Sequence, residues 1–190
     1  MTDVLERALG EWLAEVRDPA RDDLSPDAER CRERIRTYIN EGLGKNMPHY
    51  AGDGAFKFCG AFVGWCWLAG GLDSAKANAF AGPDVPGSPF GSTYRLLAAA
   101  KRCPGFALER FTDIRPTDVV CVKTTGDAAY GDHVVLALAW DKALSELTCV
   151  HANGNGRLPS GAWAEGVVVS AYPRAAIRAA YRLDSRWFRG

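Results

Sequence analysis

One cysteine of this chain occupies a position where a thiol can act as a nucleophile. Cys59 lies at the predicted start of an apolar helix, where unpaired backbone N–H groups and the helix dipole favour a thiolate. Gly60 leaves the first turn open to a substrate, and Lys57 adds positive potential. A catalytic thiol also needs a base and donors for the oxyanion. The pattern indicates nucleophilic catalysis; the alternative is one more buried cysteine on an apolar helix.

The base must come from three histidines. His49 lies in a polar loop between predicted helices and is expected at the surface. His133 opens an apolar strand, and His151 lies near the end of the next one. A lone histidine in such a strand is more often a hydrogen-bonded core or edge residue than a catalytic one. The residues next to each histidine in the sheet must therefore show which role it has.

The predicted hairpin that carries both strand histidines supplies those neighbours. A turn centred near Ala143 pairs His133 with Asn153, whereas a turn centred near Lys142 pairs it with His151. Directly opposite residues face the same side of a sheet, and residues two apart on one strand also share a face. We therefore expect an imidazole and an orienting polar group at one sheet edge. The sequence leaves the register open. Antiparallel partners have position numbers with a constant sum, and an odd sum would put His133 and these polar residues on opposite faces.

Hydrophobic periodicity predicts the elements that position these residues. Helices are expected over residues 3–17, from Ser25-Pro26 to Gly42 and Gly44, over 58–69, and over 93–101 after a Ser92 cap, with loops at 45–55 and 81–91. Strands are expected over 118–123, 133–140, 147–153, 166–170 and 179–183. The helix at 58–69 is apolar almost all round, so it should be central and buried. Helices precede strands, which predicts an α+β fold with an antiparallel meander.

Composition narrows the class of protein. A chain of 190 residues fits one domain, in which residues 1–25 look like an added helical segment. Lys+Arg and Asp+Glu both number 23, so no net charge argues for nucleic acid. The N-terminus lacks the apolar stretch of a secretory signal, and no run is long enough to span a membrane, so we expect synthesis in the cytoplasm without membrane insertion.

The six cysteines show no C-x-x-C pair, which fits a reducing compartment. Four of them are expected to be small buried hydrophobic residues, namely Cys31, Cys66, Cys103 and Cys121.

Several segments resemble the CHAP and NlpC/P60 cysteine peptidases in order and spacing over about residues 30–185. The nucleophile helix of that family resembles Phe58-Cys59-Gly60-Ala61-Phe62-Val63 with its closing Ala69-Gly70, and the turn into the sheet resembles Arg115-Pro116-Thr117-Asp118. The histidine strand resembles Asp132-His133-Val134-Val135, and the next strands resemble His151-Ala152-Asn153-Gly154 and Gly166-Val167-Val168-Val169. Thr117 stands where the family has glycine, a change expected to matter little, and the loop at 81–91 has no counterpart.

The resemblance implies a papain-like fold and hydrolysis of peptide or amide bonds, most often in bacterial peptidoglycan. Cys59 would attack the carbonyl, and His133 would carry the proton. Asn153 would orient the imidazole, because the asparagine of the CHAP branch falls there; His151 is the alternative, as in NlpC/P60 enzymes. The peptidoglycan peptide stem would be the substrate, and no cofactor or metal is expected.

A hydrolase made without a signal would reach a cell wall by non-classical export, into a rival's periplasm or during phage lysis. A secreted effector would also imply a protective inhibitor as partner. Three alternatives remain: an intracellular protease or deamidase acting on protein, an inactive binding module of the same fold, and a metal site built from Cys59, His133, Cys149 and His151.

Overall fold

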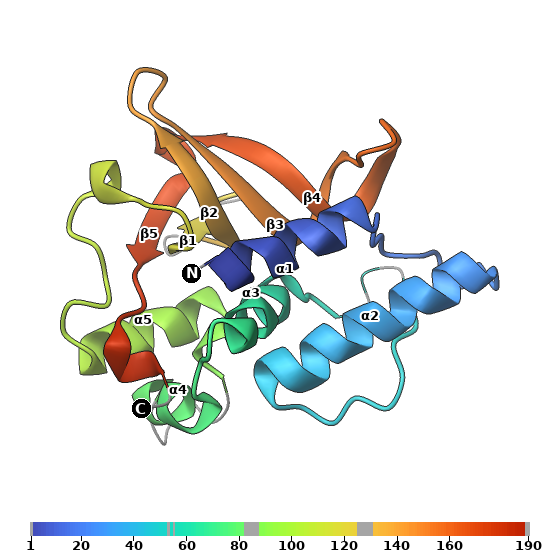
Figure 1. The fold of residues 1–190 in the computed structure, drawn as a ribbon, viewed down its shortest axis with the longest axis horizontal. Helices are drawn as coiled ribbons and strands as arrows, with labels where there is room; N and C mark the ends of the chain where they lie inside the picture. The colour runs from blue at the N-terminus through green and yellow to red at the C-terminus, as the bar shows by residue number, and fades with distance from the viewer. Residues whose placement is uncertain (1, 53, 55, 82–87, 125–130, 189–190) are drawn as a thin grey trace.

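The computed structural model describes residues 2–52, 54, 56–81, 88–124 and 131–188. Helices gather on one side of a five-stranded antiparallel sheet, which confirms the α+β class (Figure 1). The helical half of the chain comes first and the strands follow, as the change of hydrophobic period predicts.

The helices begin and end largely where capping residues predict. They are α1 (Thr2–Leu13), α2 (Pro26–Leu43), α3 (Cys59–Ala69), α4 (Ser74–Ala81) and α5 (Thr93–Arg102). Ser25 and Ser92 accept N–H groups of the first turns of α2 and α5, and Gly44 ends α2 in the left-handed conformation. The prediction for the first helix was too long, because α1 ends at Leu13 and Glu15 adopts a φ of 51°.

Helix α3 is the central buried helix, as predicted. All its residues from Gly60 to Trp67 are buried, between α2 and the strands. The Tyr38 ring of α2 lies 5.4 Å from Phe62 and 4.9 Å from Trp65, measured between ring centroids. This apolar packing fixes the position of the N-terminus of α3, where Cys59 lies.

The N-terminal segment is part of the same core. Val4, Ala8 and Val16 are fully buried. Glu11 of α1, also buried, accepts hydrogen bonds from the Tyr38 hydroxyl at 2.5 Å and from Arg34. Buried carboxylates need such donors, so α1 is bound to α2 by a polar contact as well as by apolar packing.

The sheet has the order β4-β3-β2-β1-β5. Its strands are β1 (Val119–Val122), β2 (His133–Asp141), β3 (Glu146–Arg157), β4 (Trp163–Pro173) and β5 (Ile177–Tyr181). The first four form the predicted meander, and β5 returns to the other edge beside β1. Strands β3 and β4 extend beyond the predicted 147–153 and 166–170, because the pairing continues through a bulge to Arg157 and Trp163.

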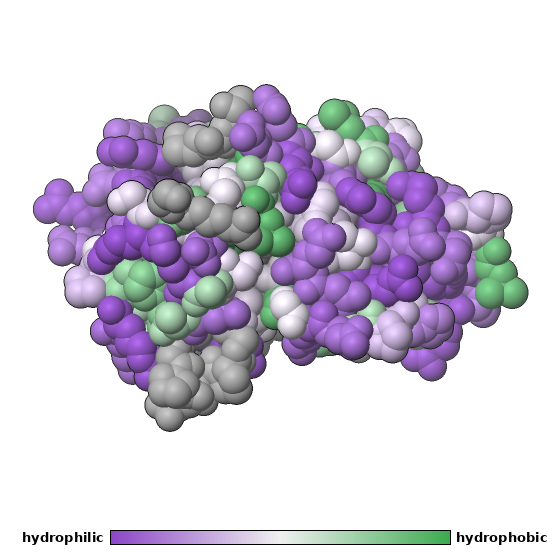
Figure 2. All heavy atoms as spheres, turned by 60° about the horizontal axis from the view of Figure 1, so that its bottom comes forward, coloured by the Kyte–Doolittle hydropathy of each residue, from purple (hydrophilic) through white to green (hydrophobic). Residues whose placement is uncertain are grey.

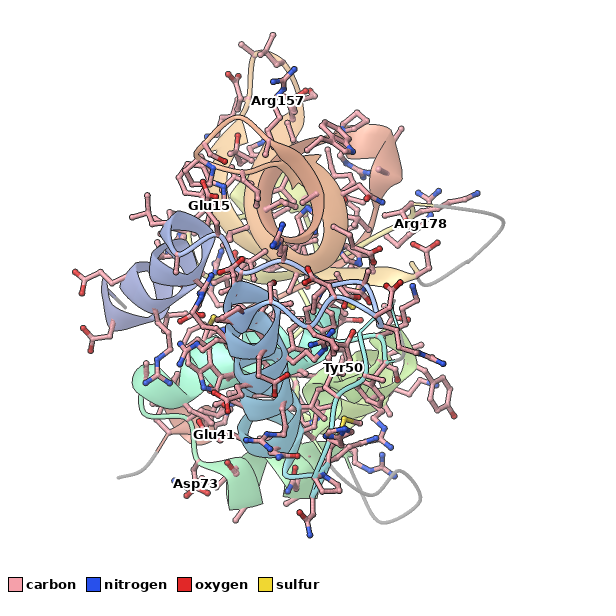
Figure 3. The ribbon with its side chains drawn as sticks, turned by 90° about the vertical axis from the view of Figure 1, so that its right-hand side faces the viewer. Glu15, Glu41, Tyr50, Asp73, Arg157 and Arg178 are labelled. Carbon is pink, nitrogen blue, oxygen red and sulfur yellow. The ribbon has the colours of Figure 1, made fainter. Side chains whose placement is uncertain are left out.

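The strands curl into a ring above the helices when seen from the side (Figure 3). Two apolar clusters lie on the two faces of this curled sheet. One contains Val134, Leu136 and Val150 together with the helices, and the other contains Val135 and Cys149. Alternate residues of β2 therefore face different clusters, as the two-residue period requires.

Other features depart from the sequence analysis. No element was predicted over residues 73–80, where α4 packs Phe80 against Trp187 at 4.5 Å between ring centroids. Of the predicted loop at 81–91, residues 82–87 lie outside the described residues, and Pro89–Gly91 form a 3-10 turn. Thr117 is buried with a φ of 77°, a left-handed conformation that is strained for a β-branched residue. Glycine would adopt this φ without strain, so the threonine is expected to cost stability here.

Hydrophilic residues cover most of the face that carries α2 and α4, and hydrophobic residues appear there in small separate patches (Figure 2). Within the described part of the chain, no helix combines the length and the apolar character that crossing a bilayer requires.

Candidate active site

Cys59 is the first residue of α3, as predicted. Backbone N–H groups of Val134, Gly60 and Cys59 itself hydrogen-bond to its sulfur, and each lowers the pKa of the thiol. Burial acts against them and is the largest effect, so the pKa of Cys59 is raised although part of the side chain remains exposed. The resting state is therefore a thiol, and the expected thiolate is not favoured.

Strand β2 supplies one of these N–H groups because it separates from β3 at this point. The ladder between β2 and β3 runs from Asp141–Glu146 to Leu136–Val150. Val134 lies beyond that end, and its N–H is directed to the sulfur instead. The end of the ladder thus places the nucleophile beside the start of β2, which carries His133.

The segment before α3 is held by the chain that follows α1. The Tyr50 hydroxyl donates to both carboxylate oxygens of Asp18 at 3.0 Å, and the Gly54 N–H donates to one of them at 2.7 Å. Tyr50 lies below the sheet, at the level of the helices (Figure 3). These contacts position the loop that leads to Cys59.

A cavity of about 150 Å³ opens beside the sulfur. Its lining includes Lys57, Cys59, Phe90, Thr93 and Asp132. The Thr93 hydroxyl donates to the Gly131 carbonyl at 3.0 Å, which ties α5 to the start of β2. The contribution of α5 to this cavity was not predictable from the sequence, because the helix cap at Ser92 carries no signal of proximity to Cys59.

Gly60 has a different role from the one predicted. A Cβ at this position would lie 1.7 Å from the carbonyl oxygen of Phe90. The missing side chain therefore admits the backbone of the 88–91 segment, rather than leaving the first turn open to a substrate.

His133 and His151 form a buried pair. Their Nε2 and Nδ1 atoms lie 2.8 Å apart, and the ring planes meet at 89°. His151 is 1% exposed and His133 is 7% exposed. Two neutral imidazoles can share one hydrogen bond in this way, one donating and the other accepting.

Burial keeps both rings neutral. It lowers the pKa of His133 to about 4, with a smaller opposing effect of Asp132 and a further lowering by Lys57. Burial lowers the pKa of His151 to about 3, helped by the proximity of His133. A neutral imidazole can act as a general base, because its lone pair is available near neutral pH.

Asn153 does not reach His133. Its side-chain amide donates to Glu165 of β4 at 2.5 Å, and its φ of 58° lies in the left-handed region. Next to the turn the paired positions have an odd sum, as in Ala139–Thr148, and a bulge between Ala137 and Ala139 produces the even register of Leu136–Val150. However, β3 bulges between His151 and Gly154, which turns Asn153 away. The placement of Asn153 beside the imidazole is corrected, and His151 occupies it.

The structure places the Cys59 sulfur beside the Val134 N–H and the His133 ring beside the His151 ring. Among the hydrogen bonds of the described residues, none links the Cys59 sulfur directly to the His133 ring. His49 is exposed in a loop, as predicted. His151 Nε2 is buried and has no hydrogen-bond partner among the described atoms.

The remaining cysteines are buried and free. Cys31, Cys66, Cys103 and Cys121 are at most 1% exposed, which confirms that they are small core residues. Cys149 donates to the Ser170 carbonyl at 3.6 Å. Within the described ranges, no three His, Cys, Asp or Glu side chains are grouped to hold a metal ion, so the four-residue metal site receives no support.

Comparisons with protein families, with curated proteins and with solved structures find no match for this chain.

Proposed function

We propose that this protein is a cysteine-dependent amide or peptide hydrolase with a papain-like arrangement, in which Cys59 is the nucleophile and His133 its base. One observation carries the proposal. The sulfur at the start of the buried helix accepts the N–H of Val134, and the residue before Val134 is a neutral histidine held by a second histidine. The nucleophile therefore lies beside the start of the strand that carries the base, and the orienting group contacts that base directly.

The proton transfers follow from the neutral state of the pair. The Cys59 thiol attacks the carbonyl carbon of the substrate as His133 takes its proton. Because Nε2 of His133 faces His151, Nδ1 is the nitrogen left for this transfer. The resulting imidazolium then gives the proton to the leaving amine, which leaves a thioester on Cys59. Water, activated by His133, hydrolyses that thioester and restores the thiol.

His151 stabilises the buried imidazolium that forms on His133 in this mechanism. When Nε2 of His133 carries a proton and donates it to Nδ1 of His151, the acceptor stabilises the positive charge that forms during attack. The neighbouring Asp132 also raises the pKa of His133. The Cys59 N–H, at the start of α3, is the donor proposed for the oxyanion.

Bacterial peptidoglycan is the proposed substrate, on the resemblance to CHAP and NlpC/P60 enzymes. Digestion of purified sacculi by the protein, followed by mass spectrometry of the released muropeptides, tests this. New amine or carboxyl ends within the peptide stem, or a freed lactyl carboxyl group, would identify the bond cleaved. Unchanged sacculi together with cleavage or deamidation of a protein substrate would favour the intracellular alternative instead.

A further inference from the structure

The second imidazole is held in place by a feature of the backbone next to it. His151 and Gly154 flank the bulge in β3, and the chain folds the glycine against the ring. A Cβ built on Gly154 would lie 2.2 Å from Cε1 of His151 and 2.5 Å from Nδ1. Both separations are well below contact distance, and Nδ1 is the atom that meets His133.

The backbone conformation does not itself require glycine at this position. Gly154 is not among the residues with positive φ, and it pairs with Gly166 of β4. Its φ is therefore not one that disfavours alanine. What alanine could not do is share the space that the His151 ring occupies.

The neighbouring residues maintain the bulge. Asn153 supplies the left-handed conformation, which asparagine tolerates better than most residues. The hydrogen bond that its side-chain amide donates to Glu165 ties the bulge to β4. The sequence His151-Ala152-Asn153-Gly154 thus combines the ring with the residue that forms the bulge and the residue that leaves space for the ring.

We propose that Gly154 is a positioning residue, whose missing side chain allows the His151 ring to meet Nε2 of His133. The expected effect on turnover rests on the proposed function, whereas the expected effect on the His133–His151 hydrogen bond does not. A methyl group at position 154 would displace the His151 ring and break the pair while leaving Cys59 and its surrounding N–H groups in place.

The substitution Gly154→Ala tests this against Gly156→Ala. Gly156 lies on the same strand, and a Cβ there would meet the Val168 side chain at 3.0–3.2 Å instead of an imidazole. On sacculi, Gly154→Ala should lower kcat by about 10-fold or more with KM nearly unchanged, because only the base is disturbed. Gly156→Ala should lower it by no more than about 2-fold.

A second readout does not depend on activity. With only three histidines, nitrogen NMR of the imidazoles can follow the His133–His151 hydrogen bond directly. Gly154→Ala should remove its signature, whereas Gly156→Ala should keep it. If Gly154→Ala lowers the melting temperature, His151→Ala should recover part of that loss in the double variant, because the clashing ring is gone.

Retention of the imidazole signature in Gly154→Ala, or additive losses of melting temperature in the double variant, would overturn the proposal. If wild-type protein proves inactive on every substrate, the proposed function fails, while the NMR and melting results still decide the role of Gly154.

Discussion

His133 and His151 meet through Nε2 and Nδ1 at 2.8 Å, with their rings perpendicular, in a position where water scarcely reaches either one. Unfolding would expose both imidazoles and return each pKa to about 6.5. The pair therefore couples the stability of the fold to pH.

The free energy of unfolding should fall as the pH falls from about 6.5 towards 4. Both folded-state pKa values are lowered, to about 4 and about 3, so the unfolded chain binds more protons in this window. Each histidine contributes a slope of up to about 1.4 kcal/mol per pH unit. Urea unfolding at several pH values measures it, and His151→Gln should reduce the slope. A flat profile between pH 6.5 and 5 would contradict the burial of the pair.

His151→Ala should lower turnover more than Asn153→Ala does. The first change removes the acceptor that stabilises the His133 imidazolium, for an expected loss of about 10-fold to 1000-fold. The second removes a bond to Glu165 and disturbs the bulge, so it should act mainly on the melting temperature. Turnover and melting measured side by side for both variants decide between them; a larger loss of turnover in Asn153→Ala would restore Asn153 as the orienting residue.

Cys59 should be the first of the six thiols to react with iodoacetamide, because the other five are buried. Its rate should continue to rise above the free-thiol pKa of about 8.5, since burial raises the pKa of the Cys59 thiol. Peptide mapping after brief labelling at several pH values measures both points. A labelling rate that reaches its plateau near neutral pH would show that Cys59 is a thiolate there, and would contradict a neutral Cys59 thiol.

Thr117→Gly should stabilise the protein relative to Thr117→Ala. Glycine adopts the φ of 77° without strain and keeps the N–H that donates to the Ala137 carbonyl at 2.8 Å. The difference should be about 1–2 kcal/mol, or roughly 2–8 °C in melting temperature for a domain of this size. A higher melting temperature for Thr117→Ala than for Thr117→Gly would contradict backbone strain at position 117.

The helical half of the fold was predictable because its signals are local. Ser25-Pro26, Gly44 and Ser92 mark helix ends by their own capping chemistry, and the apolar run of α3 predicts burial from composition alone. Helix α4 was missed although Asp73 caps it by accepting the N–H groups of Ala75 and Lys76. It is short and is also held by long-range contacts such as Phe80 with the distant Trp187.

The site was predictable as a set of residues but not as a geometry. Cys59, His133 and His151 stand out by type and position. The strand period relates residues within one strand only, so it does not decide whether the two histidines share a face. His151 rather than Asn153 contacts His133 because of the bulge in β3. That bulge forms where a left-handed asparagine precedes a glycine. The Asn-Gly pair carries a signal for such a turn, but not its direction relative to His133.

The central claim is that the Cys59 thiol forms the bond to the substrate. Cys66→Ala provides a matched control in the same helix, because Cys66 is fully buried and its loss should cost only stability, about 1–2 kcal/mol. The decisive measurement is the rate of muropeptide release from purified sacculi by folded wild-type, Cys59→Ala and Cys66→Ala proteins. We predict that Cys59→Ala melts near the wild-type temperature and releases nothing above the spontaneous rate, while Cys66→Ala melts lower and stays active. Release by Cys59→Ala at the wild-type rate would contradict the assignment of Cys59 as the nucleophile.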